Sequence, residues 1–222
     1  HRDLHSFPTR RSSDLPITLG YELMNEPIAT MFSDSLRAAL NAKLEPLYKR
    51  ATKAIREVDL NHIILLGGAQ WNGNFEPFSD WKFDDKIMYT CHRYGGEPTK
   101  AAIQSIIDFR DKTKLPMYMG EIGHNTDQWQ ADFCATMKKA NIGYTFWPYK
   151  KIDGSCMMGI KKPADWDSTI VKFAEADRSS FDAIRKARPD QEKGKKLLME
   201  FVENAKQKNC VQIGRASCRE RV

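Results

Sequence analysis

Apolar residues along this chain occur either in short continuous runs or in longer stretches with helical spacing. The short runs lie at residues 17–26, 62–67, 87–94, 116–121 and 142–147. Runs of this length between helices are typical of parallel strands that are buried on both faces. The pattern therefore predicts five strands.

The stretches between these runs carry apolar residues three or four positions apart, which is the spacing of an amphipathic helix. They predict helices over about 33–58, 99–112, 127–140, 165–187 and 192–207. Ser33 is suited to cap the first helix, and Pro46 inside it can kink or restart it. A loop is expected between Pro148 and Lys162.

Strands that alternate with helices are parallel and are joined by right-handed crossovers. Residues capable of chemistry stand at the predicted strand ends: Asn25, Glu26, His92, Tyr94, Glu121 and Trp147. Catalytic groups of a TIM barrel occupy this position. The sequence thus predicts an α/β fold, part of a (β/α)8 TIM barrel. The alternative, a doubly wound sheet, would want a glycine-rich phosphate loop, and Gly67-Gly68 lacks the G-x-G-x-x-G spacing.

Two glutamates end predicted strands that lie far apart along the chain. Glu26 closes the first strand, and Pro27 then ends the strand pairing because proline has no N–H to donate. Glu121 closes the strand that begins at Pro116. The carboxyl ends of parallel strands meet at one edge of a sheet, so we predict that the two glutamates form a pair. Glu22, within the first strand, is expected to face inward in a polar network.

The two ends of the chain are related at the DNA level. A DNA sequence that encodes residues 5–15 has a reverse complement that contains a sequence encoding residues 213–222. Unrelated peptide ends should not share this property, whereas a sequencing adapter read at both ends of a DNA fragment would. We interpret 1–15 and 212–222 as adapter-derived and 16–211 as the native part. Basic terminal arms are the alternative.

Composition places the chain among soluble globular proteins that are long enough for a real core. It has 222 residues, 41% apolar and 29% charged, with a mean hydropathy of −0.58. No apolar run approaches the length of a membrane span. The net charge is +6, half of it in the two ends, and gives no reason to expect a nucleic-acid partner. The cysteines outside the two ends are Cys91, Cys134, Cys156 and Cys210. They lack C-x-x-C spacing, which argues against a zinc site, and they are either isolated thiols or include one disulfide.

Four short motifs occur in one order along the chain: Asn25-Glu26-Pro27, His92-x-Tyr94, Gly120-Glu121 and Phe146-Trp147. This ordered set resembles glycoside hydrolase family 5, the cellulase family, whose acid and nucleophile lie on barrel strands four and seven. The resemblance covers most of residues 16–211. It implies that the chain begins at the fourth of eight strands, without the arginine and histidine of the second and third. We therefore expect this fragment to be inactive and to expose unpaired strand edges.

The resemblance implies a retaining mechanism with two carboxyl groups close together. Glu26 would be the acid/base, which must carry a proton to help the leaving sugar depart. Glu121 would be the nucleophile, which must be ionised. Tyr94 would donate a hydrogen bond to this nucleophile and help to keep it ionised.

The same resemblance assigns substrate contacts. Asn25 would hydrogen-bond the hydroxyl on the second sugar carbon, and His92 would bind other hydroxyls. Trp147 would stack beneath a sugar ring. Trp71, with Asn72 and Trp81, is expected either to line sugar subsites or to pack in the fold.

The implied substrate is a β-linked polysaccharide or oligosaccharide, first a β-1,4-glucan cut internally, with mannan or xyloglucan as alternatives. The family is usually exported, which implies an extracellular or periplasmic location. The chemistry needs no metal and no cofactor. Two rival functions stay open. One is a non-catalytic carbohydrate-binding remnant. The other is a metal-dependent barrel enzyme, against which the single histidine on the strand ends, His92, argues.

Overall fold

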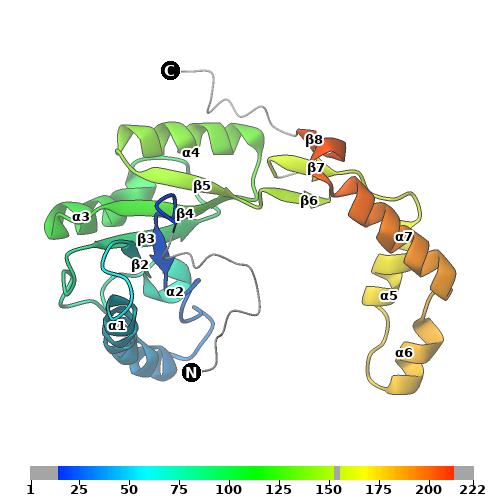
Figure 1. The fold of residues 1–222 in the computed structure, drawn as a ribbon, viewed down its shortest axis with the longest axis horizontal. Helices are drawn as coiled ribbons and strands as arrows, with labels where there is room; N and C mark the ends of the chain where they lie inside the picture. The colour runs from blue at the N-terminus through cyan, green and yellow to red at the C-terminus, as the bar shows by residue number, and fades with distance from the viewer. Residues whose placement is uncertain (1–14, 153–155, 213–222) are drawn as a thin grey trace. The chain divides into compact units, whose positions relative to one another are not determined.

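A computed structural model of the chain describes residues 15–152 and 156–212 (Figure 1). The segments interpreted as adapter-derived lie almost wholly outside the described residues, so that interpretation stays a prediction. The described residues form two compact units. The first contains the residues up to Ile122 together with Asp132–Thr145, and the second contains Gly123–Ala131 and the residues from Phe146 on. No helix in the described ranges has the length and apolar composition needed to cross a bilayer.

A five-stranded sheet organises the first unit, and its strands follow chain order (Figure 1). They are β1 (Gly20–Glu22), β2 (Ile63–Gly67), β3 (Ile87–Arg93), β4 (Met117–Gly123) and β5 (Gly143–Trp147). The pairs from β1 to β4 are parallel. Chain order with parallel pairing requires a crossover between successive strands. Helices occupy the crossovers from β1 to β2, from β3 to β4 and from β4 to β5, whereas a turn and a loop connect β2 to β3. The prediction of parallel strands that alternate with helices is confirmed.

The helices of this sheet also follow the predicted pattern. They are α1 (Asp34–Arg56), a short 3-10 turn (Ala101–Ile103) leading into α3 (Gln104–Thr113), and α4 (Asp127–Lys139). The Ser33 hydroxyl accepts a hydrogen bond from the Leu36 amide at the start of α1. This helix continues through Pro46 without a break. The label α2 covers Ala69–Asn72, a left-handed turn after β2.

The core lies between the sheet and its helices. Leu44 and Tyr48 of α1 are buried one helical turn apart, and the Tyr48 hydroxyl donates to the carbonyl of Gly67 at 2.9 Å. Ile64 and Leu66 of β2 are fully buried. Each aliphatic side chain buried in this way stabilises the fold by about 1.5–3 kcal/mol. The described cysteines are free thiols, of which Cys91 and Cys134 are buried in the core.

The first strand is much shorter than predicted. The sequence predicts a strand over residues 17–26, whereas β1 contains only Gly20–Glu22. The physical reason is the backbone beyond the strand, where Glu26 and Ile28 take φ values of +46° and +65°. Those values are incompatible with an extended strand, so the chain must turn before it reaches Glu26.

The chain after Trp147 differs most from the prediction. The expected loop contains β6 (Lys150–Ile152) and β7 (Met158–Ile160), which pair in parallel, and β7 pairs antiparallel with β8 (Val211–Gln212). The expected long helix over 165–187 is instead a π-helical turn (Asp167–Val171) followed by α5 (Lys172–Ala174) and α6 (Phe181–Ala187). It breaks because the Asp177 side chain accepts from the Ser179 amide and Ser180 caps α6. The last helix, α7 (Gln191–Asn204), agrees with the prediction.

A buried carboxylate fastens β1 to the turn before β2. Asp59 accepts hydrogen bonds from the Tyr21 hydroxyl at 2.5 Å and from the ring Nδ1 of His62 at 2.7 Å. It also accepts from the backbone amides of Asn61 and His62. The Tyr21 hydroxyl, with these other donors, holds the pKa of Asp59 well below its usual range.

We predict that Asp59→Asn lowers the free energy of unfolding at about pH 7. The folded pKa is lower than the unfolded one, so the stabilisation is present above the unfolded pKa and is lost as the pH falls through the folded pKa. The gap between wild type and variant should therefore narrow as the pH is lowered below about 4. Urea unfolding at a series of pH values measures this gap, with the exposed Asp85→Asn as control. A gap that does not change with pH would show that the charge of Asp59 is not the cause.

Candidate active site

Glu26 lies in the turn that follows β1, and its side chain is 22% exposed. Its backbone takes a left-handed φ of +46°, and Pro27 behind it is buried. A residue other than glycine adopts this conformation at a cost, and such strain is concentrated at functional sites. The turn holds the carboxyl group of Glu26 against the neighbouring strands instead of releasing it into solvent.

Glu121 reaches the same place through an irregularity in β4. Cys91 of β3 lies opposite Met119, but His92 lies opposite Glu121, so Gly120 is an extra residue on β4. Side chains alternate between the two faces of a strand, and one inserted residue reverses that alternation beyond it. The bulge therefore turns Glu121 to the face on which His92 lies.

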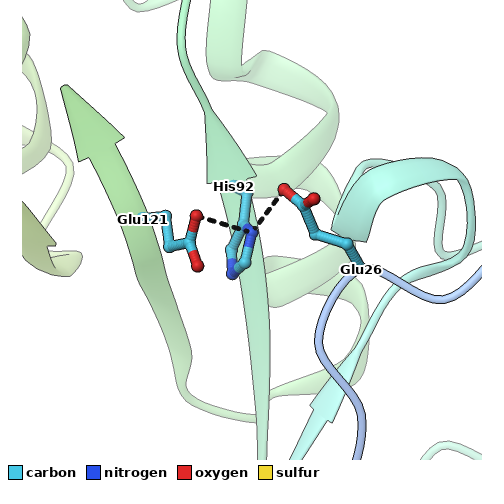
Figure 2. Close-up of side chains that lie close together, drawn as sticks. All are labelled: Glu26, His92 and Glu121. Carbon is cyan, nitrogen blue, oxygen red and sulfur yellow. Dashed lines mark hydrogen bonds and ion pairs between the residues drawn. The ribbon is translucent and has the colours of Figure 1, made fainter. Parts of the chain in front are cut away.

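His92 lies between the two glutamates, as Figure 2 shows. Its Nδ1 is 2.9 Å from Oε1 of Glu26 and 3.6 Å from Oε2 of Glu121. The three ligand-type atoms of Glu26, His92 and Glu121 all lie within 4.8 Å of one another. The predicted pairing of the two glutamates is thus present in the structure.

The surroundings of His92 differ from the expectation that it binds sugar hydroxyls. Its side chain is only 2% exposed. Its Nδ1 faces Glu26, and its Nε2 lies 3.1 Å from Nδ2 of Asn72. Both ring nitrogens therefore contact protein groups, and His92 lies between Glu26 and Glu121.

Tyr94 follows β3 directly, and its hydroxyl donates a hydrogen bond to Oε2 of Glu121. Burial of the ring, together with the adjacent Glu121 carboxylate, raises the pKa of Tyr94 far above its ordinary value. The hydroxyl stays protonated at any ordinary pH and remains a donor. The hydrogen bond expected from Tyr94 to Glu121 is present in the structure.

Glu22 and Asn72 surround the other side of the imidazole. Oε1 of Glu22 is 3.9 Å from Nε2 of His92, so Glu22 takes part in the expected polar network, but its side chain is 35% exposed and does not face the interior. Burial raises the pKa of Glu22, and the Glu121 charge raises it further, while His92 and the Asn72 amide lower it in part. Asn72 is fully buried, so it packs inside the fold and lines no sugar subsite.

The other predicted contacts are placed less closely. Asn25 is exposed beside Glu26. Trp71 is 39% exposed, and its Nε1 donates to the Thr30 hydroxyl at 2.9 Å. Trp147 belongs to the second unit, is 48% exposed and meets the His124 ring edge-on at 6.2 Å. Their roles in sugar binding stay predictions. Trp81 packs in the fold, donating to the carbonyl of Phe78 with Lys112 over its ring.

The arrangement suits chemistry that needs two carboxyl groups on either side of one bond. Retaining glycosidases have these groups about 5–5.5 Å apart, whereas inverting ones separate them by about 6.5–9.5 Å. In this site one carboxylate oxygen of Glu26 lies within 4.8 Å of one of Glu121, which is compatible with the shorter spacing. Among the described residues, Glu26, His92 and Glu121 are also the only cluster whose atoms lie close enough together to ligate a metal. They are the residues of the pair itself and not a further ligand set.

Known proteins were compared with this chain. A sequence model of the family Cellulase (glycosyl hydrolase family 5) matches residues 14–152. Endoglucanase A of Butyrivibrio fibrisolvens is 30% identical over 170 residues, which are 72% of this chain and 36% of that protein. The chain thus spans about a third of that relative's length.

Two solved structures show the same fold. Endoglucanase Cel5A of the hyperthermophile Thermotoga maritima aligns with a TM-score of 0.54 and 23% identity, over 66% of this chain and 56% of that one. The structure of T. maritima Cel5A with mannotriose aligns with a TM-score of 0.54 and 20% identity, over 81% and 62% of the two chains. The five-stranded sheet with its helices is accordingly a curled part of a TIM barrel, as the sequence predicts.

We predict that Gly120→Ala disturbs this site. A Cβ atom at this position would lie 2.5 Å from the Thr90 hydroxyl and 3.2 Å from Nε2 of His92. Both neighbours are buried and have little room to move, so the methyl group should destabilise the fold by about 1–3 kcal/mol. Urea unfolding measures the loss.

Gly95→Ala is the matched control, since a Cβ there meets nothing within 4 Å. It should change stability far less than Gly120→Ala. Equal effects of the two substitutions would contradict the packing of Gly120 against His92.

Proposed function

The chain belongs to glycosyl hydrolase family 5, and on that premise we propose that it carries the catalytic pair of a retaining glycoside hydrolase acting on β-linked polysaccharide. One observation carries the proposal. Carboxylate oxygens of Glu26 and Glu121 lie within 4.8 Å of one another, and the Tyr94 hydroxyl donates to Glu121. A pair at this distance with unequal partners is what a retaining mechanism requires.

The proposed reaction has two steps. In the first, a carboxylate oxygen of Glu121 attacks the anomeric carbon while Glu26 gives its proton to the departing glycosidic oxygen. A covalent glycosyl ester on Glu121 and a free sugar hydroxyl result. In the second, Glu26 takes a proton from water, and the water oxygen attacks the anomeric carbon and releases Glu121. The anomeric configuration is inverted twice and so retained.

We propose an internal linkage of a β-1,4-glucan as the first substrate. The relative Endoglucanase A supports this choice, since an endoglucanase cuts glucan chains internally. Mannan is the second choice, in line with the mannotriose substrate in the T. maritima structure. Xyloglucan remains a third. The exposed Trp71 offers a flat apolar face of the kind on which sugar rings stack. Export to the cell surface or periplasm is part of the same proposal.

We also infer that this chain by itself turns over polysaccharide poorly. In the described residues the sheet has five strands in a row, and β1 and β5 are its edges. A closed barrel has no edges and holds its loops in one ring around the substrate. A second candidate function, sugar binding without turnover, is favoured by the same open sheet. A reaction that needs only Glu26 and Glu121 can distinguish a hydrolase from a protein that binds sugar without turnover.

We predict that Glu121 becomes covalently labelled by an activated fluoro-cellobioside. In this reagent fluorine replaces the hydroxyl next to the anomeric carbon, which slows release of the enzyme, and dinitrophenolate leaves without needing a proton. Intact-mass and peptide mass spectrometry should find one sugar per chain on Glu121. Glu121→Gln should take no label, whereas Glu26→Gln should still be labelled because the leaving group needs no acid.

The exposed Glu97→Gln serves as control and should be labelled like wild type. Label on any residue other than Glu121 would refute the assignment of the nucleophile. Binding of cello-oligosaccharides by calorimetry without labelling would establish the binding remnant in place of the hydrolase.

Tyr94→Phe should slow this labelling by roughly 10²-fold, because loss of one well-placed hydrogen-bond donor costs about that much. The time course of the mass change measures the rate. Tyr118→Phe removes a hydroxyl from the neighbouring strand β4 and should leave the rate unchanged. An unaltered rate in Tyr94→Phe would remove Tyr94 from the mechanism.

A further inference from the structure

We propose that Asn72 is a positioning residue, which holds His92 as the neutral tautomer with its proton on Nδ1 and so aims that N–H at Glu26. For its catalytic meaning the inference rests on the function proposed above. Asn72 lies on the turn after β2, whereas His92 lies on β3 and Glu26 follows β1. The sequence pattern gave Asn72 no such role.

The hydrogen positions follow from what each atom can donate. The Asn72 amide nitrogen is a donor only, and it lies 3.1 Å from Nε2 of His92. Nε2 must therefore accept this hydrogen bond, and the single proton of the neutral ring belongs on Nδ1. From there it points to Oε1 of Glu26 at 2.9 Å, with Oε2 of Glu121 next nearest at 3.6 Å (Figure 2).

Glu22 fixes which way round the Asn72 amide lies. The Asn72 amide also lowers the pKa of the Glu22 carboxyl in part, so its nitrogen faces that carboxyl as well as Nε2 of His92. A reversed amide would set its oxygen against the Glu22 oxygens, which repel it. In the observed orientation Oδ1 of Asn72 is buried and has no hydrogen-bond partner among the described residues. Leaving a buried acceptor unsatisfied is costly, so the contacts of the nitrogen with His92 and Glu22 must outweigh that loss.

The backbone around Asn72 is shaped for this contact. Gln70, Trp71 and Asn72 take φ values of +48°, +62° and +59°, a left-handed turn without a glycine. Backbone hydrogen bonds between Ala69 and Asn74 close the turn in both directions. Gly67 makes room, since a Cβ there would lie 2.3 Å from Oδ1 of Asn72. A strained turn that is held in place by its surroundings is typical of a functional site.

The neutral tautomer matters because carboxyl groups surround the ring. Glu22 from β1, Glu26 from the turn after it and Glu121 from β4 all lie within 4 Å of a His92 nitrogen, and the Tyr94 hydroxyl lies beside Glu121. A ring with a second proton on Nε2 would be an imidazolium. An imidazolium next to Glu26 would in turn oppose the proton that Glu26 must deliver. With its N–H directed at Nε2, Asn72 occupies the lone pair to which a second ring proton would bind.

Nitrogen-15 NMR of the histidine side chains tests the inference in the chain as it is. The His92 signals are assigned by their loss in His92→Gln. Wild type should show a protonated Nδ1 and an unprotonated Nε2 at neutral pH. Asn72→Asp keeps the shape and tolerates the left-handed backbone, but it replaces the donor by an acceptor. This variant should carry a proton on Nε2. Asn74→Asp, in the same turn, is the matched control and should leave the His92 signals unchanged.

Labelling rates report the consequence for Glu26. Asn72→Asp should slow labelling by a fluoro-cellobioside whose poorer phenolate leaving group needs the Glu26 proton, by about tenfold, a part of what acid catalysis supplies. Labelling with the dinitrophenolate reagent should change little. A merely structural defect would slow both reagents equally and leave the tautomer as it was.

A wild-type spectrum with the proton on Nε2 would overturn the inference without any substitution. So would an Asn72→Asp variant with an unaltered His92 spectrum. If neither reagent labels the wild-type chain while the NMR result holds, the proposed hydrolase function fails and the tautomer assignment stands.

Discussion

The extra residue in β4 brings the two carboxyl groups together, and the geometry of the site depends on it. Parallel pairing sets Cys91 against Met119, and without a bulge His92 would lie opposite Gly120. The alternation of side chains would then direct Glu121 to the other face of the sheet. Gly120 suits the extra position because a Cβ there would press on Thr90 and His92. The bulge therefore determines both how β4 pairs with β3 and on which face of the sheet the Glu121 carboxyl group lies.

Three carboxyl groups approach one buried imidazole, and hydrogen bonds decide how they coexist. Burial and the Glu121 charge raise the pKa of Glu22, which favours its neutral form. Tyr94 is held protonated and offers a permanent donor to Glu121. His92 stands between Glu26 and Glu121 and can donate to only one of them at full strength. The site thus separates the charges with neutral donors, and the described residues place no arginine or lysine within ion-pair distance of its carboxyls.

Much of this fold was predictable because the signals are local. Continuous apolar runs predicted the strands, helical spacing predicted α1, α3 and α4, and the polar residues at strand ends predicted the pair. The parts that were missed depend on contacts distant in sequence or on single backbone angles. Nothing local distinguishes Asn72 from an exposed loop asparagine, because its burial depends on His92, 20 residues away. The strands β6 and β7 are three residues each, too short to show alternation. The sequence signal nearest to Asn72 was Gly67-Gly68. A pair of glycines indicates a place where another side chain approaches the backbone closely.

The roles of the two glutamates can be separated by physical argument only through their partners. Their side chains are almost equally exposed, at 22% for Glu26 and 21% for Glu121, so desolvation favours neither as the acid. The asymmetry lies in the donors. Tyr94 gives its hydrogen bond to Glu121, which stabilises a carboxylate there, and no such hydroxyl contact is recorded for Glu26 in the described residues. Glu26 instead meets the Nδ1–H of His92 at 2.9 Å, so the two carboxyl groups differ in the kind of donor that each receives, a hydroxyl at Glu121 and an imidazole N–H at Glu26.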